Sequence, residues 1–408
     1  MSDNGARDVL VAGGGLAGGL AALALARLGF EVTLVEARAP VPAGERADTR
    51  DGRSISLSLA SLRVLEALGV ADALGADSQL ITTVHISEAG HYGRLCFTAR
   101  EMGVPALGRV VPAEPLLARI METAEAAGVK RISPATVDTT ELDNGGAHRT
   151  VTMTGPDGEQ PVATRLLIVA DGAGSALRDA LGIRHDTHRY RHTALVTAAR
   201  VSAPRPGVAY ERFTREGTLA ILPRAGDRVG VVWTVPESRA DELAALSPED
   251  YLAKVASALG GRLGSMTSVA PLRHFPLSST HAMAQTAARA VIIGNAAHSL
   301  HPIAAQGFNL SVRDIAVLAE CLAGHADPGE PAAIKRYGER RRRDQARTRA
   351  YTGFVRTLGD LETPLASPLR ALGLLAAEFN RPLARALARQ GMGFSPRPLP
   401  GLVRGERL

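Results

Sequence analysis

The chain has 408 residues, of which 45% are hydrophobic and 22% charged, and its formal net charge is +6. This balance excludes a disordered protein, and the length favours two domains or one large α/β unit with an insertion. Cys96 and Cys321 are isolated, which argues against a disulfide framework or a zinc site and fits a reducing cytoplasm. Arginine supplies nearly all of the positive charge, which is more typical of a genome-level preference than of a nucleic-acid surface.

A charge-free stretch lies near the start of the chain, between Asp8 and Arg27. Its length, roughly 18 residues, is the lower limit for a membrane-spanning helix. However, the glycines in its first half weaken a continuous helix, and we see no basic segment or cleavage site before it. We therefore predict a buried strand over residues 8–12, a helix over 16–28 and a second strand over 31–36.

The turn between the first strand and the helix contains glycines in the pattern GxGxxG. Gly13 permits the tight turn, Gly15 lets the backbone approach a pyrophosphate, and Gly18 lets the helix pack against the strand. The free N–H groups at the helix start then face the phosphates. Glu36 ends the second strand, where it can accept hydrogen bonds from an adenosine ribose and would repel a 2′-phosphate. The pattern predicts a dinucleotide site but does not separate NAD from FAD.

A second segment, ATRLLIVADGAGSALRDALGI, predicts another strand over residues 166–170. This strand ends at Asp171, and a helix with Ser175 and Arg178 in its first turns follows. The strand is an uninterrupted apolar run, as expected in a sheet that is buried on both faces, and such sheets bind ligands at the carboxyl ends of their strands. Asp171 is therefore a candidate ligand-binding residue. The alternative is that it only caps the following helix.

A third segment, GNAAHSLHPIAAQGFNL, has the same layout, with an apolar strand over 290–293 before it and a helix that begins near 307–309. His298 and His301 lack a third ligand at helical spacing, so we expect no metal site. Ser299 has no GxSxG context, which argues against a nucleophile. The favoured interpretation is a ligand-binding site formed by the backbone, in which N–H groups at the helix start face a negatively charged atom.

These three segments resemble the three fingerprints of class A flavoprotein monooxygenases, which are FAD enzymes of the p-hydroxybenzoate hydroxylase fold. The resemblance covers about residues 8–350. Within this superfamily the chain is most similar to the ubiquinone-biosynthesis hydroxylases, through DGRSISLSLASLRVLEALGV, ITTVHISEAGHYG, ERFTREGTLAILP and GNAAHSLHPIAAQGFNLSVRD. One position departs from the usual pattern, because Asn295 stands where most members have an aspartate that contacts the flavin's ribityl chain.

The resemblance implies an α/β fold, with a Rossmann-like FAD-binding domain, an inserted antiparallel-sheet substrate domain and a C-terminal helical region. Alternating apolar residues in the inserted segments independently indicate antiparallel strands. The expected boundaries are 1–79, 107–187 and 277–350 for the FAD-binding domain, 80–106 and 188–276 for the substrate domain, and 351–408 for the C-terminal helices.

The resemblance also implies an activity. Members of the family reduce FAD with NAD(P)H, form a flavin C4a-hydroperoxide with O2 and transfer one oxygen atom to a phenol. The expected function is hydroxylation of a prenylated phenol of the 2-polyprenyl-6-methoxyphenol type in ubiquinone biosynthesis. Since the cofactor carries this chemistry, the sequence needs no metal, nucleophile or acid–base pair. The alternatives are hydroxylation of another aromatic metabolite, and a non-catalytic flavin-fold scaffold of a biosynthetic complex.

The family's residue roles are carried over to this chain by position. The pyrophosphate and ribose are expected to contact Gly13, Gly15, Leu16, Ala17, Gly18 and Glu36, and the pyrophosphate–ribityl side Asp171, Gly172 and Asn295. Near the flavin ring we expect Arg53, Arg109, Pro302, Gly307, Phe308 and Asn309, with Pro302, Gly307 and Phe308 at the oxygen site. The backbone N–H groups of Gly307, Phe308 and Asn309 would stabilise negative charge on the reduced ring. A surface position is the alternative for Arg53, and a structural salt bridge for Arg109.

The C-terminal part of the chain allows two interpretations. The basic block KRYGERRRRDQARTR contains interspersed acids and favours a solvated helix face, with a phosphate- or membrane-facing patch as the alternative. After residue 349, leucine faces with arginines between them predict either a capping bundle or an amphipathic contact with a membrane or a partner. We expect a cytoplasmic protein, peripheral to the inner membrane in the second case. The expected partners are a prenylated phenol and other ubiquinone-biosynthesis proteins, and no nucleic acid.

Overall fold

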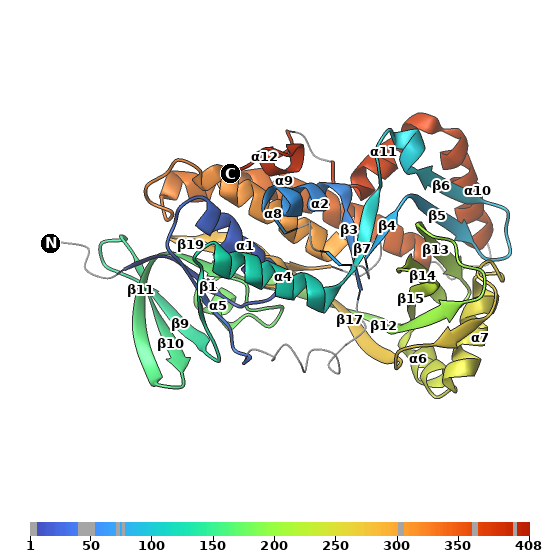
Figure 1. Ribbon diagram of the computed structural model, residues 1–408, viewed down its shortest axis with the longest axis horizontal. Helices are drawn as coiled ribbons and strands as arrows, with labels where there is room; N and C mark the ends of the chain where they lie inside the picture. Colours follow the sequence, from blue (N-terminus) through green and yellow to red (C-terminus); the bar gives the residue numbers. More distant parts are fainter. Residues whose placement is uncertain are drawn as a thin grey trace.

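Two large β-sheets organise the chain, one in each half of the molecule, and long helices lie along one side (Figure 1). The structure is a computed structural model that describes residues 6–39, 54–70, 74–75, 78–300, 306–360, 366–394 and 398–408.

The first sheet has the strand order β18-β19-β11-β1-β2-β8, and its strands are parallel from β19 to β8. The strands are β1 (Arg7–Ala12), β2 (Val32–Val35), β8 (Lys130–Ile132), β11 (Gly158–Val169), β18 (Thr286–Ala287) and β19 (Ala290–Ile292). Val9 and Val11 pack on one face of the sheet while Leu10 and Ala12 pack on the other, and all four are almost fully buried. Burial on both faces explains why residues 9–12 of this strand are all apolar.

Helices cover one face of this sheet. They are α1 (Leu16–Arg27), α2 (Leu59–Ala67), α4 (Ala113–Ala126) and α8 (Gln306–Leu322). Gly19 allows α1 to approach α4 closely, because a Cβ there would lie 2.7 Å from a carbon of Met121. The predicted helix over 16–28 and the strand starting at 31 are thus confirmed to within one residue at each end.

The second sheet has the order β20-β17-β12-β15-β14-β13-β5-β6, with β16 paired to β12. Its strands are β5 (Thr83–Glu88), β6 (Arg94–Thr98), β12 (His185–Val201), β13 (Val208–Thr214), β14 (Gly217–Pro223), β15 (Arg228–Pro236), β16 (Met266–Ser268), β17 (Arg273–Ala282) and β20 (His298–Ser299). The short α6 (Glu237–Ala244) and α7 (Pro248–Ala258) cover one face, where Trp233 and Tyr251 form part of a buried cluster.

The second sheet differs from the sequence expectation in two respects. Its strands are antiparallel except for β13 and β5, which run parallel because β5 comes from a distant part of the chain. The predicted boundaries after residues 187 and 276 fall inside β12 and β17, since these long strands pair with each other between the two halves of the molecule (Figure 1).

A small third sheet lies between the two large ones in the described chain. It consists of β3 (Ser54–Ser58), β7 (Gly108–Pro112) and β4 (Gln79–Ile81), and α3 (Ala99–Met102) lies nearby after β6. Strand β3 of this sheet packs against α8, so the small sheet lies next to the helix that follows the third predicted segment.

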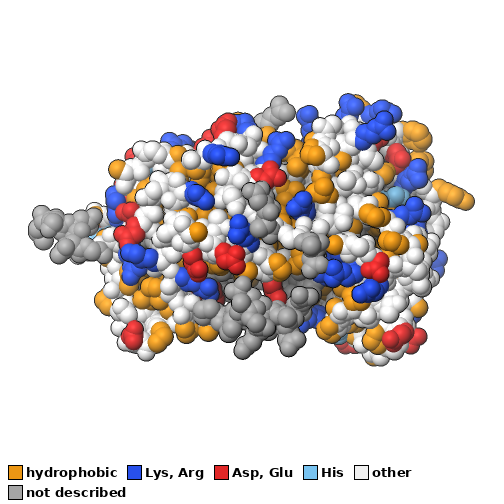
Figure 2. Space-filling view, in the orientation of Figure 1, with side chains coloured by type: hydrophobic (Ala, Val, Ile, Leu, Met, Phe, Trp, Pro, Cys, Tyr) orange, Lys and Arg blue, Asp and Glu red, His pale blue; other side chains and the backbone are white. Residues whose placement is uncertain are grey.

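The C-terminal region consists of helices. They are α9 (Pro331–Asp360), α10 (Ala366–Phe379), α11 (Arg381–Gly391) and α12 (Gly401–Arg404). The predicted boundary at residue 350 falls inside α9. Helix α10 packs on β5 and β6, and Figure 2 shows apolar and basic side chains together at this end of the molecule. Within the described ranges, we find no helix that combines the length and apolarity needed to cross a membrane.

The basic block lies on α9 and is only partly a solvated face. Arg341 is buried, and it donates to Asp314 of α8 at 2.5 Å while also pairing with Asp344. Arg313 of α8 donates to Asp344 in return, at 3.0 Å. Arg342 and its neighbour Arg343 are exposed. The block therefore contributes both to the contact between α8 and α9 and to the surface.

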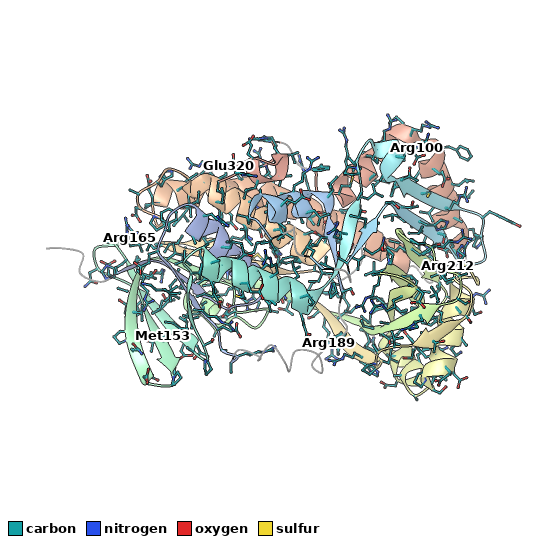
Figure 3. The ribbon with its side chains drawn as sticks, in the orientation of Figure 1. Arg100, Met153, Arg165, Arg189, Arg212 and Glu320 are labelled. Carbon is teal, nitrogen blue, oxygen red and sulfur yellow. The ribbon has the colours of Figure 1, made fainter. Side chains whose placement is uncertain are left out.

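A hairpin that the sequence analysis did not place extends the first sheet. It consists of β9 (Thr136–Leu142) and β10 (Arg149–Gly155), and β10 pairs with β11. Met153 of β10 is buried against the face of the sheet opposite the helices, together with Leu177 of α5 (Ala176–Ala180) (Figure 3). The hairpin thereby closes the second face of the parallel strands.

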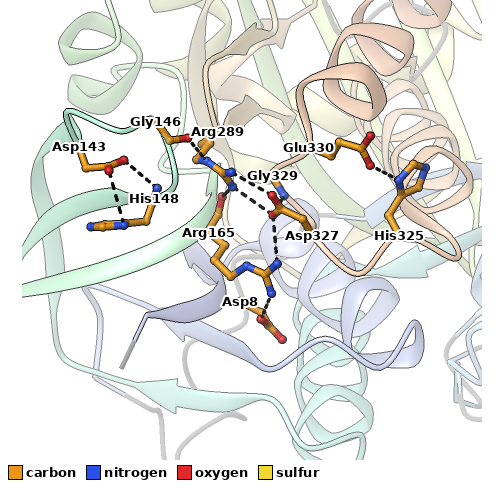
Figure 4. Close-up of polar contacts among 10 residues, drawn as sticks. All are labelled: Asp8, Asp143, Gly146, His148, Arg165, Arg289, His325, Asp327, Gly329 and Glu330. Carbon is orange, nitrogen blue, oxygen red and sulfur yellow. Dashed lines mark hydrogen bonds and ion pairs between the residues drawn. The ribbon is translucent and has the colours of Figure 1, made fainter. Parts of the chain in front are cut away.

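Ion pairs connect the amino-terminal ends of the parallel strands (Figure 4). Arg165 of β11 pairs with Asp8 of β1 at 3.0 Å and with Asp327 at 3.6 Å. Arg289, just before β19, pairs with the same Asp327 at 2.9 Å and donates to the carbonyl of Gly146 in the hairpin loop. These charges hold together strand ends that lie opposite to the carboxyl ends.

We predict that Asp327→Asn lowers the free energy of unfolding by about 1 kcal/mol at pH 7, because the ion pairs are partly buried. Burial acts to raise the pKa of Asp327, but the hydrogen bonds from Arg289 and from the Gly329 N–H outweigh it and lower the pKa. The acid therefore stabilises the fold above the ordinary carboxyl range near ~3.9, and this stabilisation is lost as the pH falls through the lower folded value.

Urea unfolding at several pH values measures this effect. Asp157→Asn, at an exposed turn of the β10–β11 connection, is the matched control and should leave stability unchanged. A constant difference between wild type and Asp327→Asn down to the most acidic pH would contradict the assignment.

Candidate functional site

Loops from three adjacent parallel strands meet at the carboxyl edge of the first sheet. The order β19-β11-β1 places Ile292, Val169 and Ala12 side by side at this edge. Backbone contacts then join the loops. A Cβ on Gly13, whose φ is +105°, would lie 2.4 Å from the Ala170 carbonyl oxygen. The first and second predicted segments are thus in direct contact, as the topology of such sheets requires.

The third segment reaches the same place from the other side. Gly294 has φ +63°, and a Cβ there would lie 2.9 Å from the Cβ of Ala17 in the first turn of α1. Gly18 is equally constrained, because its Cβ would lie 1.9 Å from the Gly13 carbonyl oxygen. The three segments predicted from the sequence are therefore brought together.

Glu36 holds the glycine loop from the end of β2. One carboxylate oxygen accepts a hydrogen bond from the Gly14 N–H at 2.6 Å, and the other accepts one from the Arg38 N–H at 2.9 Å. Each carboxylate oxygen has a further lone pair, so the side chain can also accept hydroxyl hydrogens of a ribose. This arrangement fits the adenosine end of FAD.

Gly15 differs from the other glycines of the loop. A Cβ there would meet nothing within 4 Å, although Gly13 and Gly18 are each blocked by backbone. Gly15 is the N-cap of α1, and no side chain caps this helix end. The N–H groups of Leu16, Ala17 and Gly18 therefore lack the usual capping acceptor, and the open space beside Gly15 lies where a pyrophosphate would supply one.

Asp171 lies just after β11, beside the start of α5, where its carboxylate interacts with the Ser175 hydroxyl and the Leu177 N–H. The N-cap of α5 is Ser175, whose hydroxyl accepts from the Arg178 N–H at 2.9 Å. The Asp171 side chain remains exposed at the loop, but the surrounding protein desolvates it and raises its pKa, against the opposing effect of a hydrogen bond with Ser175. Gly172 beside it has φ +105° and open space at its Cβ position. The carboxylate is thus exposed at the loop and also interacts with the start of α5.

Arg178 joins the second and third loops. Its buried guanidinium donates to the carbonyl oxygens of Ala173 at 3.0 Å and Ala296 at 3.2 Å. Ala296 belongs to the short 3-10 helix η2 (Gly294–Ala296), which also carries Asn295. Arg178 therefore fixes the distance between Asp171 and Asn295, whose side chain is exposed at the loop.

His298 is a buried, paired residue. Its Nε2 contacts one carboxylate oxygen of Asp314, and the other carboxylate oxygen accepts a hydrogen bond from Arg341. The sequence analysis missed Asp314, because only the packing of α8 on the loop brings the two side chains together. His301 and Pro302 lie outside the described residues. Among those that are described, no three His, Cys, Asp or Glu side chains come together as metal ligands.

The first turn of α8 contains Gly307, Phe308 and Asn309. The Asn309 side chain is used within the chain, since its Oδ1 accepts from the Ser58 N–H and its Nδ2 donates to the Ser56 carbonyl, both at 2.8 Å. This clamp ties α8 to β3. A Cβ on Gly307 would meet open space, and Phe308 packs at the edge of the main core. The backbone N–H groups of this turn are the ones predicted to face the flavin.

Arg109 lies on β7, opposite Leu57 of β3. Its Nε is buried and has no hydrogen-bond partner, and the structure gives it no ion pair with a described residue. The salt-bridge alternative thus has no described partner. Arg53, the other arginine expected near the flavin, lies outside the described residues.

Comparison with known proteins agrees with this geometry. The family model "FAD binding domain" matches residues 6–350. The chain is 34% identical to ubiquinone hydroxylase UbiL of Rhodospirillum rubrum, over 98% of this chain and 93% of that protein. It is 29% identical to the 3-demethoxyubiquinol 3-hydroxylase of Escherichia coli, over 95% of this chain and 98% of that protein. The crystal structure of p-nitrophenol 4-monooxygenase PnpA from Pseudomonas putida matches with a TM-score of 0.77 at 16% identity, over 97% and 99% of the two chains.

The fold and the matched family define a flavoprotein hydroxylase. The chain belongs to the FAD-binding domain family and is a flavin-dependent aromatic monooxygenase with FAD as its cofactor. When bound, FAD accepts a hydride equivalent and activates O2, and the protein supplies binding, orientation and electrostatics.

We predict that Gly15→Val removes FAD binding without unfolding the protein. A valine fits the apoprotein because nothing lies within 4 Å of its Cβ, and the φ of −72° suits any residue. It would, however, occupy the space that the pyrophosphate needs. The flavin absorbance of the purified protein measures the loss.

Gly391→Val is the matched control, because Gly391 also has open space at its Cβ position but lies at the end of α11. It should retain the flavin. A yellow Gly15→Val protein with normal flavin content would refute the assignment of this loop.

Proposed function

We propose that the protein hydroxylates a prenylated phenol of the 2-polyprenyl-6-methoxyphenol type in ubiquinone biosynthesis, with NAD(P)H and O2 as co-substrates. The support from sequence is that the UbiL of Rhodospirillum rubrum matches 98% of this chain, so the similarity extends past the family model into the C-terminal helices. The observation that carries the proposal is the surface of these helices, which suits a lipid-linked substrate better than a soluble one.

In this proposal the chain's own residues hold FAD from one end to the other. Glu36 binds the ribose, and the first turn of α1 binds the pyrophosphate. Asp171 and Asn295, at a distance that Arg178 fixes, bind the ribityl side. The backbone N–H groups at the start of α8 face the negative charge of the reduced ring, since preorganised donors act there without rearrangement. Pro302, outside the described residues, is proposed to face the ring.

Helix α10 exposes apolar side chains in one stripe. Leu369, Leu372 and Phe379 are spaced by three and seven residues, so they lie on one face of the helix. Their exposed fractions are 64%, 61% and 81%. The opposite face is held to the second sheet, because Arg370 pairs with Glu88 of β5 at 2.8 Å and both side chains are buried. The stripe is therefore presented outwards by a fixed helix.

Helix α11 adds positive charge beside this stripe. Arg381, Arg385 and Arg389 are all exposed and repeat every four residues, which places them on one face. No acidic residue occurs on α11, and the structure gives these arginines no ion pair with a described residue. Leu383, between them, is 45% exposed. An apolar face flanked by unpaired arginines is the pattern of a helix that lies on an anionic membrane.

We propose that α10 and α11 dock the protein on an anionic phospholipid bilayer. The apolar stripe enters the headgroup–acyl boundary, and the arginines contact lipid phosphates. Large exposed apolar patches on a protein mark interaction sites. A bilayer is the favoured occupant because the unpaired charge on α11 is of one sign and complements acidic headgroups. Peripheral docking would also bring the enzyme to a membrane-dissolved phenol.

We predict that the double variant Leu372→Asp with Phe379→Asp reduces binding to vesicles of phosphatidylcholine and phosphatidylglycerol by more than tenfold, because each buried apolar side chain contributes about 2 kcal/mol. Changing Arg381, Arg385 and Arg389 together to Gln should remove the preference for these vesicles over pure phosphatidylcholine. Vesicle flotation measures both effects.

Leu142→Asp with Val269→Asp is the control, because both are exposed apolar side chains, at 40% and 43%, that lie outside α10 and α11. A different outcome would contradict membrane docking. If the wild-type protein does not bind vesicles but forms dimers, and the Leu372→Asp with Phe379→Asp variant is monomeric, the stripe binds a second copy of the chain.

Deletion of the gene in its host tests the substrate. We predict that ubiquinone falls and that a prenylated methoxyphenol lacking one hydroxyl group accumulates, as measured by mass spectrometry of extracted quinones. A plasmid copy of the wild-type gene should reverse both changes, whereas a Gly15→Val copy should reverse neither. Unchanged ubiquinone in the deletion strain would favour another aromatic substrate.

A further inference from the structure

The two faces of β13 have different neighbours. Tyr210 packs in the buried cluster beneath α7, and Arg212 donates to the carbonyl of Ala258 at the end of α7 at 2.8 Å (Figure 3). Because side chains alternate along a strand, Glu211 points to the opposite face of the sheet, as does Phe213. On that face Phe213 lies beneath Arg370 of α10, with 5.7 Å from the guanidinium carbon to the ring centroid.

Strand register places small and apolar residues around Glu211. Its partners are Ile86 on β5 and Ala220 on β14, and the row continues to Val232 on β15 and Val196 on β12. All of these are half-buried. By contrast, Leu219, Val231 and Leu195, one position away and on the face covered by α6 and α7, are completely buried. The described residues therefore leave the Glu211 face of the sheet incompletely covered.

Glu211 is the single charged residue between Ile86 and Val196, and the row ends four strands from β13 at the exposed Arg273 of β17. Burial raises the pKa of its carboxyl group to about 7. The structure gives it no hydrogen bond or ion pair with a described residue, yet its side chain is half-buried and not closed off. The half-buried side chain therefore lies on the incompletely covered face of the sheet, where it keeps some accessible surface.

Few ionisable groups surround this carboxyl group. From α9 it faces Tyr351, whose pKa is raised to about 12 by burial and then by the charge of Glu211. Its neighbours on β5 and β14 are not titratable. Arg370 of α10 is already engaged by Glu88 through two hydrogen bonds, and Arg212 belongs to the opposite face. No described cation compensates the charge of Glu211.

An uncompensated deep carboxylate destabilises a fold. Perturbed acids of this kind gather at functional sites, where a buried group is matched to the proton that it moves. A phenol has a pKa of about 10, as tyrosine does, so a carboxyl group near 7 is a better-matched base than an ordinary one near 4.3. The apolar row beside Glu211 suits an aromatic ring with a hydrocarbon tail.

We propose that Glu211 binds the phenolic hydroxyl of the substrate and takes its proton, which makes it a catalytic residue of the hydroxylation. This inference rests on the function proposed above. The phenol O–H bond breaks, the proton passes to a Glu211 carboxylate oxygen, and the electron pair stays on the phenolate oxygen. The negative charge then increases the electron density of the ring carbons ortho and para to it, where oxygen is inserted. Glu211 later returns the proton to solvent.

Glu211→Gln tests the proposal with 2-methoxy-6-prenylphenol as the probe. At pH 7 we expect hydroxylated product per turnover to fall about a hundredfold, the usual contribution of a general base. Flavin content should remain that of wild type. Raising the pH towards the pKa of the phenol should restore the variant, because the probe then ionises without help. Glu211→Asp should retain part of the wild-type rate.

A readout independent of turnover is the affinity for the probe, measured by perturbation of the flavin spectrum. Wild-type affinity should increase as the pH rises through about 7, because a carboxylate accepts a stronger hydrogen bond than a carboxylic acid does. The affinity of Glu211→Gln should not change over this range. This measurement also separates the two proposals. If the wild-type protein binds the probe without hydroxylating it, the proposed substrate is contradicted. The pH dependence of binding still tests the role of Glu211.

Folding does not limit the test. The pKa of Glu211 rises from its ordinary 4.5 to about 7, so the unfolded chain ionises first and the native state loses stability between these values. Glutamine removes this loss, and the melting temperature of Glu211→Gln at pH 8 should equal or exceed that of wild type. Glu216→Gln, on the turn that follows β13, is the control and should behave as wild type. A turnover defect that persists at every pH, or a wild-type pH profile in Glu211→Gln, would overturn the proposal.

Discussion

Backbone contact between loops is the constraint on which the cofactor-binding half depends. Three parallel strands end side by side, and the loops that leave them approach so closely that Gly13 and Gly294 have no room for a Cβ. Such proximity is possible because parallel strands in one sheet are only about 4.8 Å apart. Arg178 then sets the spacing of the loops after β11 and β19 through their carbonyl oxygens. Polar side chains from distant segments thereby converge without contacting one another.

The sequence predicts this edge well because each part of it is encoded locally. A glycine pattern, an apolar run and a terminal acid lie within a few residues of each other, so Gly13, Glu36 and Asp171 are recognisable before the fold is known. Arg178 is visible as well, but its second acceptor, Ala296, lies 118 residues away. Likewise the pairing of His298 with Asp314 and the clamp made by Asn309 depend on how α8 docks. Alternation identifies strands but not their partners, which is why the β9–β10 hairpin, the parallel β13–β5 pair and the domain boundaries inside long strands required the structure.

Two kinds of buried charge coexist in the chain. Asp314 is desolvated, which acts to raise its pKa, yet Arg341 and His298 outweigh this effect and lower it well below its ordinary range. That acid is satisfied and acts structurally, as buried ion pairs require partners on every side. Glu211 is desolvated without compensation. The desolvation cost of Asp314 is thus offset by partners within the protein. For Glu211 the protein provides no such partner, and the substrate is proposed to offset the cost.

The proposed membrane surface and the proposed base share one geometry. Helix α10 packs on β5 and β6, and Arg370 on its inner side covers Phe213, two residues from Glu211 on the same sheet face. Two strand spacings, about 10 Å, separate β13 from β6. A phenol held at Glu211 could therefore direct a hydrocarbon tail along the apolar row and beneath α10 towards the lipid boundary. A soluble aromatic substrate would need the acid but not the apolar stripe, so the presence of both on adjoining elements favours a substrate with a polar head and a long apolar tail.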